Sequence, residues 1–292
     1  MSRSATLFAL LTISLWSFLA YLASRLSHLP PFLVVGIALC IGGMVGIYQI
    51  RNWRVPIRTF LVGLVGLFGY HFLLFTAFQY APTVEANSIN YLWPLLIVLL
   101  SPVYLPGYKL KPHHIFGALI GLAGAGLVLS GGHLSLDMAN LKGYLLAAAA
   151  ALVWASYSLL TKRLPPFPTA AVGGFCLSSG IISLGLYGLG NLGSARLPAS
   201  LSLQDWIFLI LIGIGPMGIA FFTWDAALKR GDPRIIGSLT YITPFCSTLV
   251  LVLLGGRSLS WVSGIAILLI VGGAVVGSWD TIRVKDRLPA TL

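Results

Sequence analysis

Long apolar stretches alternate with short polar segments along most of the chain. Each stretch has about 20 residues, the length that an α-helix needs to cross a bilayer, whereas barrel strands have about ten residues of alternating polarity. Only helices and closed barrels satisfy their backbone hydrogen bonds in lipid. The pattern therefore predicts ten membrane-spanning helices, at residues 4–24, 32–50, 58–80, 84–105, 113–131, 142–162, 168–190, 204–227, 234–255 and 259–279.

The composition is that of a membrane protein. Hydrophobic residues make up 58% of the 292 residues and charged residues only 9%, whereas a soluble domain carries about 25% charged residues. The three cysteines, Cys40, Cys176 and Cys246, each lie within an apolar stretch. Thiols in such stretches are typically small core residues, so we expect no disulfide, no metal site and no cofactor.

The basic residues predict how the chain is oriented in the membrane. If the N-terminus is cytoplasmic, all of the 18 Lys and Arg residues face the cytoplasm except Arg25, Lys142, Arg196 and Arg257. Such an asymmetry is the positive-inside rule, and it places both termini in the cytoplasm. Because the net charge of +11 is explained by topology, we expect no nucleic-acid partner.

The two halves of the chain share a weak internal repeat. Trp16 precedes Arg25 by nine residues and Trp154 precedes Arg163 by nine, while residues 91–95 align with residues 241–245. An odd number of helices per repeat forces opposite orientations, so we expect two inverted five-helix repeats, 1–132 and 133–280, and a cytoplasmic tail, 281–292. Transporters built in this way bind substrate near the bilayer midplane. The alternative is a chance alignment of apolar helices.

No charged residue lies at the centre of a predicted span. Asp225 lies near a span end, one turn before Lys229, which predicts a salt bridge at the membrane interface. A carrier of phosphorylated solutes needs cations in its pathway, so the pattern favours a neutral or zwitterionic, largely apolar substrate. His71 is the only deep titratable residue; it is either a hydrogen-bonded structural residue or a proton carrier or substrate contact. Uncoupled, facilitated transport is therefore expected.

The stretch 84–105 is unusually rich in polar and aromatic residues. Asn87, Asn90, Tyr91 and Pro94 share one helix face. Pro94 leaves the carbonyl of Asn90 without its helical donor, and a buried amide is unfavourable unless it finds a partner. The alternative is that prolines shape the helices and the amides bond to neighbouring helices. Helix kinks are expected at Pro94, Pro216 and Pro244.

Several aromatic residues lie deeper than interfacial anchors do. Their rings can stack an aromatic substrate and offer hydrogen bonds, although helix packing is an equally good explanation. The expected substrate-binding residues are Tyr70, His71, Asn87, Asn90, Tyr91, Trp93, Trp154, Tyr157 and Tyr241.

The run Gly69-Tyr70-His71-Phe72 and the run from Glu85 to Leu95 resemble the drug/metabolite transporter superfamily of EamA type. Within it, the chain is most similar to the bacterial aromatic amino acid exporters. The resemblance implies the ten-helix, two-repeat fold in a bacterial inner membrane. It also implies export of phenylalanine, tyrosine, tryptophan and other neutral amino acids by alternating access. The first span lacks the glutamate on which the small multidrug members depend, which argues against proton antiport by their mechanism.

Alternative functions stay open at this point. A broad-specificity multidrug or metabolite exporter, proton-coupled or not, would use the same aromatic cavity. A membrane enzyme is disfavoured, since the sequence has no H-E-x-x-H, no G-x-S-x-G and no paired intramembrane carboxylates. A receptor that binds without transport would leave the inverted repeat unexplained. The expected partners are a small-molecule substrate and the lipid bilayer; a monomer is compatible with the sequence, which does not fix the oligomeric state.

Overall fold

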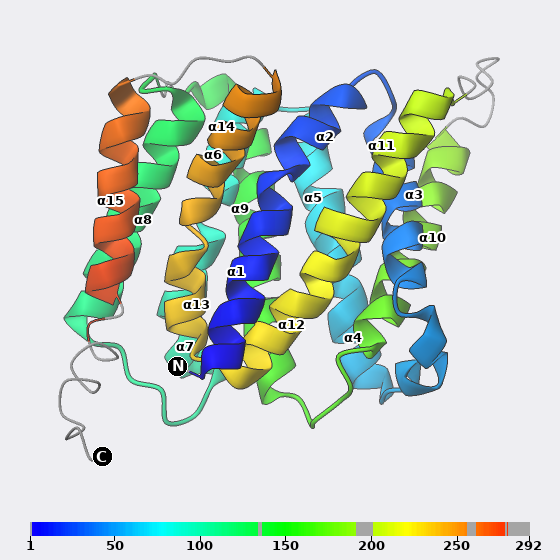
Figure 1. The fold of residues 1–292 in the computed structure, drawn as a ribbon, viewed down its shortest axis with the longest axis horizontal. Coiled ribbons are helices and arrows are strands. Elements are labelled where there is room, and N and C mark those ends of the chain that lie inside the picture. The colour runs from blue at the N-terminus through cyan, green and yellow to red at the C-terminus, as the bar shows by residue number, and fades with distance from the viewer. Residues whose placement is uncertain (1, 134–135, 191–200, 256–260, 278, 280–292) are drawn as a thin grey trace.

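The computed structural model describes residues 2–133, 136–190, 201–255, 261–277 and 279, and these ranges contain helices and loops but no strand (Figure 1). The expected tail, 281–292, lies outside the described residues. The α-helices are α1 (Arg3–Ser17), α2 (Leu19–Arg25), α3 (Pro31–Met44), α4 (Ile57–Leu64), α5 (Tyr70–Ala77), α6 (Thr83–Asn90), α7 (Trp93–Tyr104), α8 (Pro112–Ser130), α9 (Leu141–Arg163), α10 (Ala171–Gly190), α11 (Leu203–Ile214), α12 (Ala220–Arg230), α13 (Pro233–Leu239), α14 (Ile242–Gly255) and α15 (Trp261–Gly277). Two 3₁₀ segments, η1 (Ile47–Trp53) and η3 (Met138–Asn140), and two π-helical segments, η2 (Val65–Gly69) and η4 (Gly215–Ile219), complete the described helices.

Eight helical stretches of the described chain are long and apolar enough to cross a membrane. Each coincides within a few residues with a predicted span, so the prediction of apolar helices is confirmed for these eight. They are Arg3–Arg25, Ile57–Ala77, Thr83–Tyr104, Pro112–Ser130, Met138–Arg163, Ala171–Gly190, Leu203–Arg230 and Pro233–Gly255.

The predicted span at 32–50 is not one straight helix. The axis turns by 87° between α3, which ends at Met44, and η1. Gln49 leaves helical geometry at φ −111° and ψ 28°. Ile47 and Tyr48 extend the apolar stretch past the bend, so the sequence pattern predicted one span where the structure has two segments. The predicted span at 259–279 contains α15, whose 17 residues are at the lower limit of the roughly 17–25 that cross a bilayer.

Two tightly packed helix pairs form opposite edges of the bundle. α8 lies along α15 at one edge and α3 along α10 at the other, with α1, α9 and α12 between them (Figure 1). Glycines permit this proximity: a Cβ at Gly273 would lie 2.6 Å from the carbonyl oxygen of Gly117, and one at Gly180 would lie 2.8 Å from that of Gly36. Backbones in contact maximise dispersion between membrane helices, where lipid gives no hydrophobic driving force.

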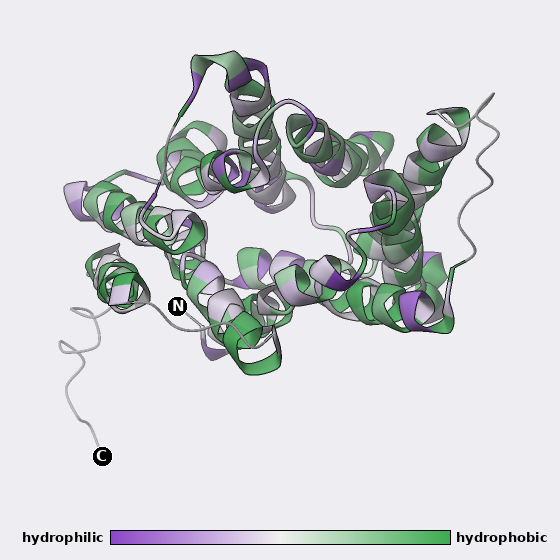
Figure 2. Ribbon diagram, turned by 90° about the horizontal axis from the view of Figure 1, so that it is seen from above, coloured by the Kyte–Doolittle hydropathy of each residue, from purple (hydrophilic) through white to green (hydrophobic). Residues whose placement is uncertain are grey.

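The outer surface of the bundle is apolar. Large hydrophobic side chains point away from the protein, among them Leu7, Leu145 and Leu268, which are 67%, 62% and 75% exposed. Hydrophobic residues predominate along the helices in the view from above (Figure 2). A surface of this kind suits hydrocarbon rather than water, because a soluble monomer rarely exposes a large contiguous apolar patch.

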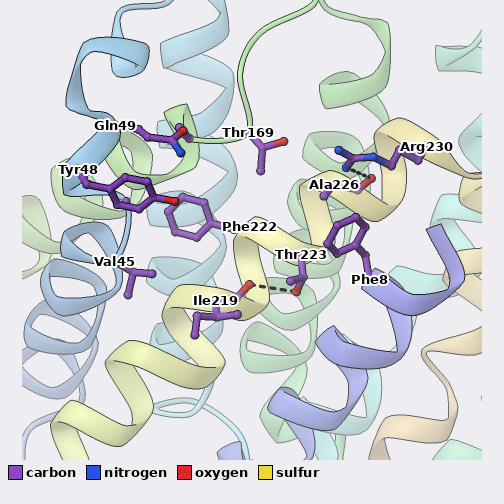
Figure 3. A pocket seen from close by; sticks show the side chains of 12 residues that line it. Phe8, Val45, Tyr48, Gln49, Thr169, Ile219, Phe222, Thr223, Ala226 and Arg230 are labelled. Atoms are coloured by element: carbon purple, nitrogen blue, oxygen red, sulfur yellow. Dashed lines mark hydrogen bonds between the residues drawn. The ribbon is translucent and has the colours of Figure 1, made fainter. Parts of the chain in front are cut away.

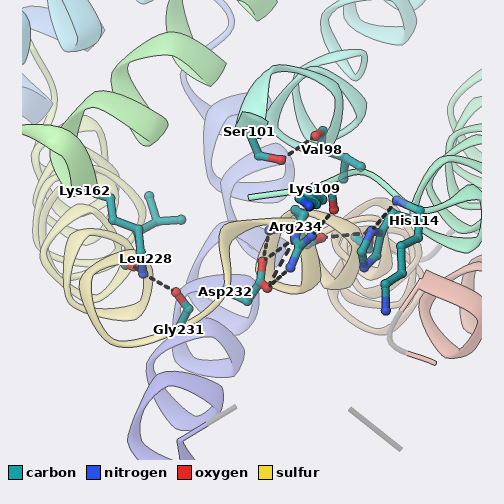
Figure 4. A network of polar contacts seen from close by, with 11 residues as sticks. Val98, Ser101, Lys109, His114, Lys162, Leu228, Gly231, Asp232 and Arg234 are labelled. Atoms are coloured by element: carbon teal, nitrogen blue, oxygen red, sulfur yellow. Dashed lines mark hydrogen bonds and ion pairs between the residues drawn. The ribbon is translucent and has the colours of Figure 1, made fainter. Parts of the chain in front are cut away.

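The N-terminus marks one end of the bundle, here called the basic end (Figure 1). Polar contacts join the two halves of the chain there (Figure 4). Arg234 pairs with Asp232 at 2.6 Å and donates a hydrogen bond of 2.7 Å to the carbonyl of Lys109. The basic residues at this end include Arg3, Lys109, Lys162, Lys229, Arg230 and Arg234.

Two lysines fasten the last turn of α12 at the basic end. The ammonium of Lys162, at the end of α9, donates to the carbonyls of Leu228, at 3.0 Å, and Gly231 (Figure 4). Lys229 donates to the carbonyl of Phe167 at 3.0 Å and lies 3.5 Å from the centroid of its ring. The bonds of Lys162 satisfy carbonyls that the C-terminus of α12 would otherwise leave without partners.

Candidate functional site

Aromatic side chains from five described helices meet in the middle of the bundle. Trp16 comes from α1, Tyr70 from α5, Trp93 from α7, Trp154 and Tyr157 from α9, and Phe221 and Trp224 from α12. We call these seven residues the central aromatic cluster. Helices of both halves of the chain contribute, so the cluster lies where the halves meet.

The rings of the cluster are packed in edge-to-face, tilted and stacked contacts. Ring centroids are 5.3 Å apart for Trp16 and Trp224, 5.6 Å for Trp93 and Trp224, and 5.1 Å for Tyr70 and Trp154. Trp93, Trp154 and Trp224 are at most 6% exposed. These separations fall within the range in which aromatic pairs attract beyond simple burial.

The polar atoms of the cluster are mostly paired. Trp16 Nε1 donates to the carbonyl of Pro216 and Trp224 Nε1 to Ser158 Oγ, both at 3.1 Å. Asn90 Nδ2 donates to Tyr70 Oη at 3.1 Å. The other side-chain atom of this buried amide, Oδ1, has no hydrogen-bond partner. An unpaired buried acceptor costs free energy, so Asn90 Oδ1 is suited to receive a donor from a ligand.

His71 lies beside the cluster. Its Nδ1 is 2.7 Å from the carbonyl oxygen of Leu67, one turn earlier on the same helix. Its ring centroid lies 5.0 Å from that of Tyr70 and 6.1 Å from that of Phe221. The bond within its own helix agrees with the structural interpretation of this histidine, and the ring contacts place it next to the cluster.

The remaining expected site residues lie around this centre or apart from it. Asn87 and Tyr91 are half-buried on α6 and at its end. Tyr241 is fully buried in a different apolar cluster with Leu95, Val98 and Ile270, so the structure does not gather it with the tryptophans.

The three prolines lie at irregular places in the helices. Pro94 is the second residue of α7, directly after the interruption at residues 91–92. Pro216 lies in η4, and Pro244 is the third residue of α14, just after the interruption at residues 240–241. Each position fits a residue that cannot donate a backbone hydrogen bond.

Sequence reasoning left three members of the cluster out of the expected site. Trp16 aligns with Trp154 in the internal repeat, which was a usable signal. Trp224 has a comparable depth, and Phe221 precedes it by three residues, so the two share a helix face. Which face of that helix points inward depends on the turn at η4, which the sequence pattern did not reveal.

Two carboxylates of the spanning helices, one next to the cluster and one apart from it, have hydrogen-bond partners. Asp225, 1% exposed, pairs with Lys229 at 2.7 Å and accepts a hydrogen bond of 2.6 Å from Thr169, which confirms the predicted salt bridge. Glu85 accepts a hydrogen bond from Tyr144 of α9. Pairing compensates the charge of Asp225, which would otherwise be very costly inside the bundle. In the part of the chain that the structure describes, no group of three or more His, Cys, Asp and Glu side chains is placed to hold a metal ion.

Comparison with known proteins gives consistent matches over nearly the whole chain. The sequence model of the EamA-like transporter family matches twice, at residues 3–130 and 141–279. The aromatic amino acid exporter YddG of Ancylobacter novellus is 43% identical over 288 residues, which cover 95% of this chain and 98% of that protein. The aromatic amino acid exporter YddG of Escherichia coli K12 is 25% identical over 290 residues, covering 94% and 96%. A solved crystal structure of a protein 41% identical to this chain superposes with a TM-score of 0.89, covering 98% of this chain and 100% of the other.

Proposed function

Since the chain belongs to the EamA-like transporter family, we propose that it exports phenylalanine, tyrosine and tryptophan across the bacterial inner membrane. Its relatives are transporters and exporters, and the chain is a multi-pass membrane transporter rather than an enzyme. The names of two relatives support the class of substrate, and the site supports it independently.

The observation that carries the proposal is the central aromatic cluster. A substrate ring can insert between tryptophans whose centroids are now 5.3–6.4 Å apart and exchange one set of ring contacts for another. Such an exchange costs little free energy, because every ring lost as a neighbour is replaced by a similar one. A site that binds its substrate without a deep free-energy minimum can also release the substrate, as a carrier requires.

The ammonium group of the substrate is assigned to polar atoms at the end of α6. Asn90 Oδ1 is buried without a donor, and Pro94 cannot donate to the backbone carbonyl of Asn90. Two neutral acceptors suit an ammonium that is paired with its own carboxylate. The zwitterion then needs no full charge on the protein side, in agreement with the uncharged rings around it.

Alternating access is proposed to rest on ten helices in two inverted repeats, 1–132 and 133–280. The double match of the family model supports this division. So does a correspondence in helix irregularities: η2 and η4 begin at Val65 and Gly215, 150 residues apart, the same separation as Tyr91 and Tyr241. π-helical turns often occur at functional sites, and they are natural places for a helix to bend.

Both termini are proposed to be cytoplasmic, because the basic end carries most of the positive charge of the described loops. Transport is proposed to be uncoupled, since the cluster itself holds no carboxylate and His71 is bonded within its own helix. The amino acid gradient then supplies the driving force.

The direct test is flux of labelled tryptophan into proteoliposomes of the purified protein, with and without an imposed pH gradient. We expect protein-dependent uptake that unlabelled phenylalanine and tyrosine compete away, that glutamate leaves unchanged, and that is the same at both pH conditions. Stimulation by the pH gradient would overturn the uncoupled mechanism alone. Competition by cationic dyes but not by phenylalanine would overturn the substrate assignment in favour of a multidrug exporter.

A further inference from the structure

Two cavities lie on the back of the helix that carries Phe221 and Trp224. The first has a volume of about 510 Å³ and lies over α12 at the basic end, with Phe8 and Arg230 on one wall and Val45, Tyr48 and Gln49 on the other (Figure 3). The second, of about 480 Å³, continues along α11 and is lined by side chains such as Leu15, Phe18 and Leu211. Ile219 belongs to both linings, so the cavities meet at this residue, and we call the two together the furrow.

The furrow opens to the outside of the bundle and not to the central aromatic cluster. Phe222, half-buried, lines it, whereas the neighbouring Phe221 and Trp224 point to the cluster. Two lining residues within long apolar helical stretches are open to the surroundings of the protein: Phe18 is 42% exposed and Leu211 48%. Around such stretches those surroundings are lipid, so this part of the furrow is a recess in the lipid-facing surface.

The furrow has the shape and polarity of an acyl-chain site. Its wall on α1 and α2 runs from Phe8 to Leu22, which spans about 21 Å at the rise of an α-helix. The hydrocarbon of one bilayer leaflet is about 15 Å thick. Beyond Ile219 the lining is apolar except for the hydroxyl of Tyr21. A recess this long and this dry favours a hydrocarbon chain over any polar solute.

The mouth at the basic end carries a guanidinium. Arg230 is exposed, its Cζ lies 4.9 Å from the centroid of the Phe8 ring, and its Nη1 donates to the carbonyl of Ala226 at 3.1 Å (Figure 3). A guanidinium has five N–H donors in a planar fork that matches phosphate geometry. Thr169 and Gln49 line the same mouth.

We infer that this furrow binds a glycerophospholipid with an anionic headgroup, its phosphate at Arg230 and one acyl chain along α12, η4 and α11. The lipid then packs against the π-helical turn that sets which face of α12 points inward. Bound lipid therefore stabilises the inward orientation of Phe221 and Trp224, so that lipid binding and the state of the central cluster are coupled.

The test is native mass spectrometry of delipidated wild-type protein titrated with dioleoylphosphatidylglycerol and, separately, with dioleoylphosphatidylcholine. The two lipids have the same chains and differ in headgroup charge. We expect tighter binding of the phosphatidylglycerol and a loss of about fivefold in its affinity in Arg230→Gln, the effect of one basic residue at a membrane surface. Arg163→Gln is the matched control, because Arg163 is also exposed at the basic end but does not line the furrow.

A second variant tests the acyl-chain half. Ile214→Trp fills the furrow at a residue that is 43% exposed, and it should weaken both lipids equally; Leu211→Trp does the same one turn earlier if the first variant does not fold. If Arg230→Gln and Arg163→Gln lose the same affinity for phosphatidylglycerol, the preference for this lipid reflects nonspecific charge, and the inference is overturned. Unchanged lipid binding in a folded furrow-filling variant would also overturn it. These readouts do not involve amino acid flux, so they stand or fall apart from the proposed function.

Discussion

The two interrupted helices, α6–α7 and α13–α14, share a construction and differ in what they do with it. Each breaks a few residues before or at a proline, Pro94 in one and Pro244 in the other. They touch one another: a Cβ at Gly237 of α13 would lie 3.3 Å from the carbonyl oxygen of Pro94. The same backbone interruption is thus present in both halves of the chain, and the side chains around it decide its role.

In α6–α7 the polar and aromatic residues reach other helices. Asn90 bonds to Tyr70 of α5, and Trp93 contacts Trp154 of α9 and Trp224 of α12. In α13–α14 two hydroxyls bond within their own helix: Thr240 Oγ1 donates to the carbonyl of Gly237 at 2.6 Å, and Ser238 Oγ to that of Arg234 at 3.0 Å. Thr243 Oγ1 is buried without a hydrogen-bond partner. We therefore propose that the first half supplies substrate recognition and that the second half supplies a matched helix interruption without contacts to the cluster.

The largest difference between the two interrupted helices is expected at Trp93 and its counterpart 150 residues later, Thr243. Trp93→Ala removes contacts with Trp16, Trp154 and Trp224, each worth about 0.5–1.5 kcal/mol, so tryptophan flux should fall by at least about tenfold. Thr243→Ala should leave flux near wild type. Proteoliposome flux normalised to folded protein measures both, with Trp93→Phe as a partial rescue. Equal losses at the two positions would contradict the division of roles.

Asn90 and Thr240 are also 150 residues apart and occupy corresponding positions in the two interrupted helices. Asn90→Ala removes the bond to Tyr70 and the unpaired Oδ1 acceptor, and we expect about a tenfold rise in the half-saturating tryptophan concentration, as for loss of a hydrogen bond to a charged group. Thr240→Val loses only a bond within its own helix. Concentration dependence of flux separates binding from turnover; a change in maximal rate alone would show that Asn90 acts on the conformational step.

The smallest expected effect concerns the link between the two halves at the basic end. Burial alone would raise the pKa of Asp232, but the hydrogen bonds and charge of Arg234 outweigh it and hold the pKa below its ordinary value. The stability that the pair contributes is therefore present above pH of about 4 and is lost as the pH falls through the lowered pKa of the folded protein. The expected contribution is at most about 1 kcal/mol. The midpoint temperature of thermal unfolding in detergent should decrease less steeply with falling pH in Asp232→Asn than in wild type.

If the unfolding temperature decreases equally steeply with falling pH in both proteins, the pair between Asp232 and Arg234 does not contribute to stability. Arg163→Gln serves as its control, because it changes the charge at the same end without touching the pair.

Apolarity predicted the helices well, because in lipid a long apolar stretch has only one way to satisfy its backbone. It failed at residues 45–50, where Ile47 and Tyr48 are as apolar as a span yet follow a bend. It also gave no sign of η2 and η4. A π-helical turn depends on tertiary packing, such as the contact between the ring of Tyr157 and Gly66. That contact cannot be predicted from the pattern of a single sequence.

The members of the central aromatic cluster were predicted from the sequence only in part. Trp93, Trp154 and Tyr70 stood out because polar aromatics deep in a span need a reason to be there. Phe221 carries no such mark, since a phenylalanine is ordinary in any apolar helix. Tyr241 shows the opposite case, because depth and aromatic character led us to expect it in the site, while the structure buries it against α8 and α15, outside the central aromatic cluster.

The lysine at the end of α9 has a mechanical consequence. With its ammonium anchored on the carbonyls of Leu228 and Gly231, Lys162 joins α9 to the last turn of α12, and Lys229 ties that turn to the segment before α10. Separating these parts would leave the carbonyls of Leu228, Gly231 and Phe167 without these lysine donors. The bonds therefore favour movement of α9, α12 and the segment before α10 as one unit, so that an opening at the basic end would form along a border other than the one between α9 and α12.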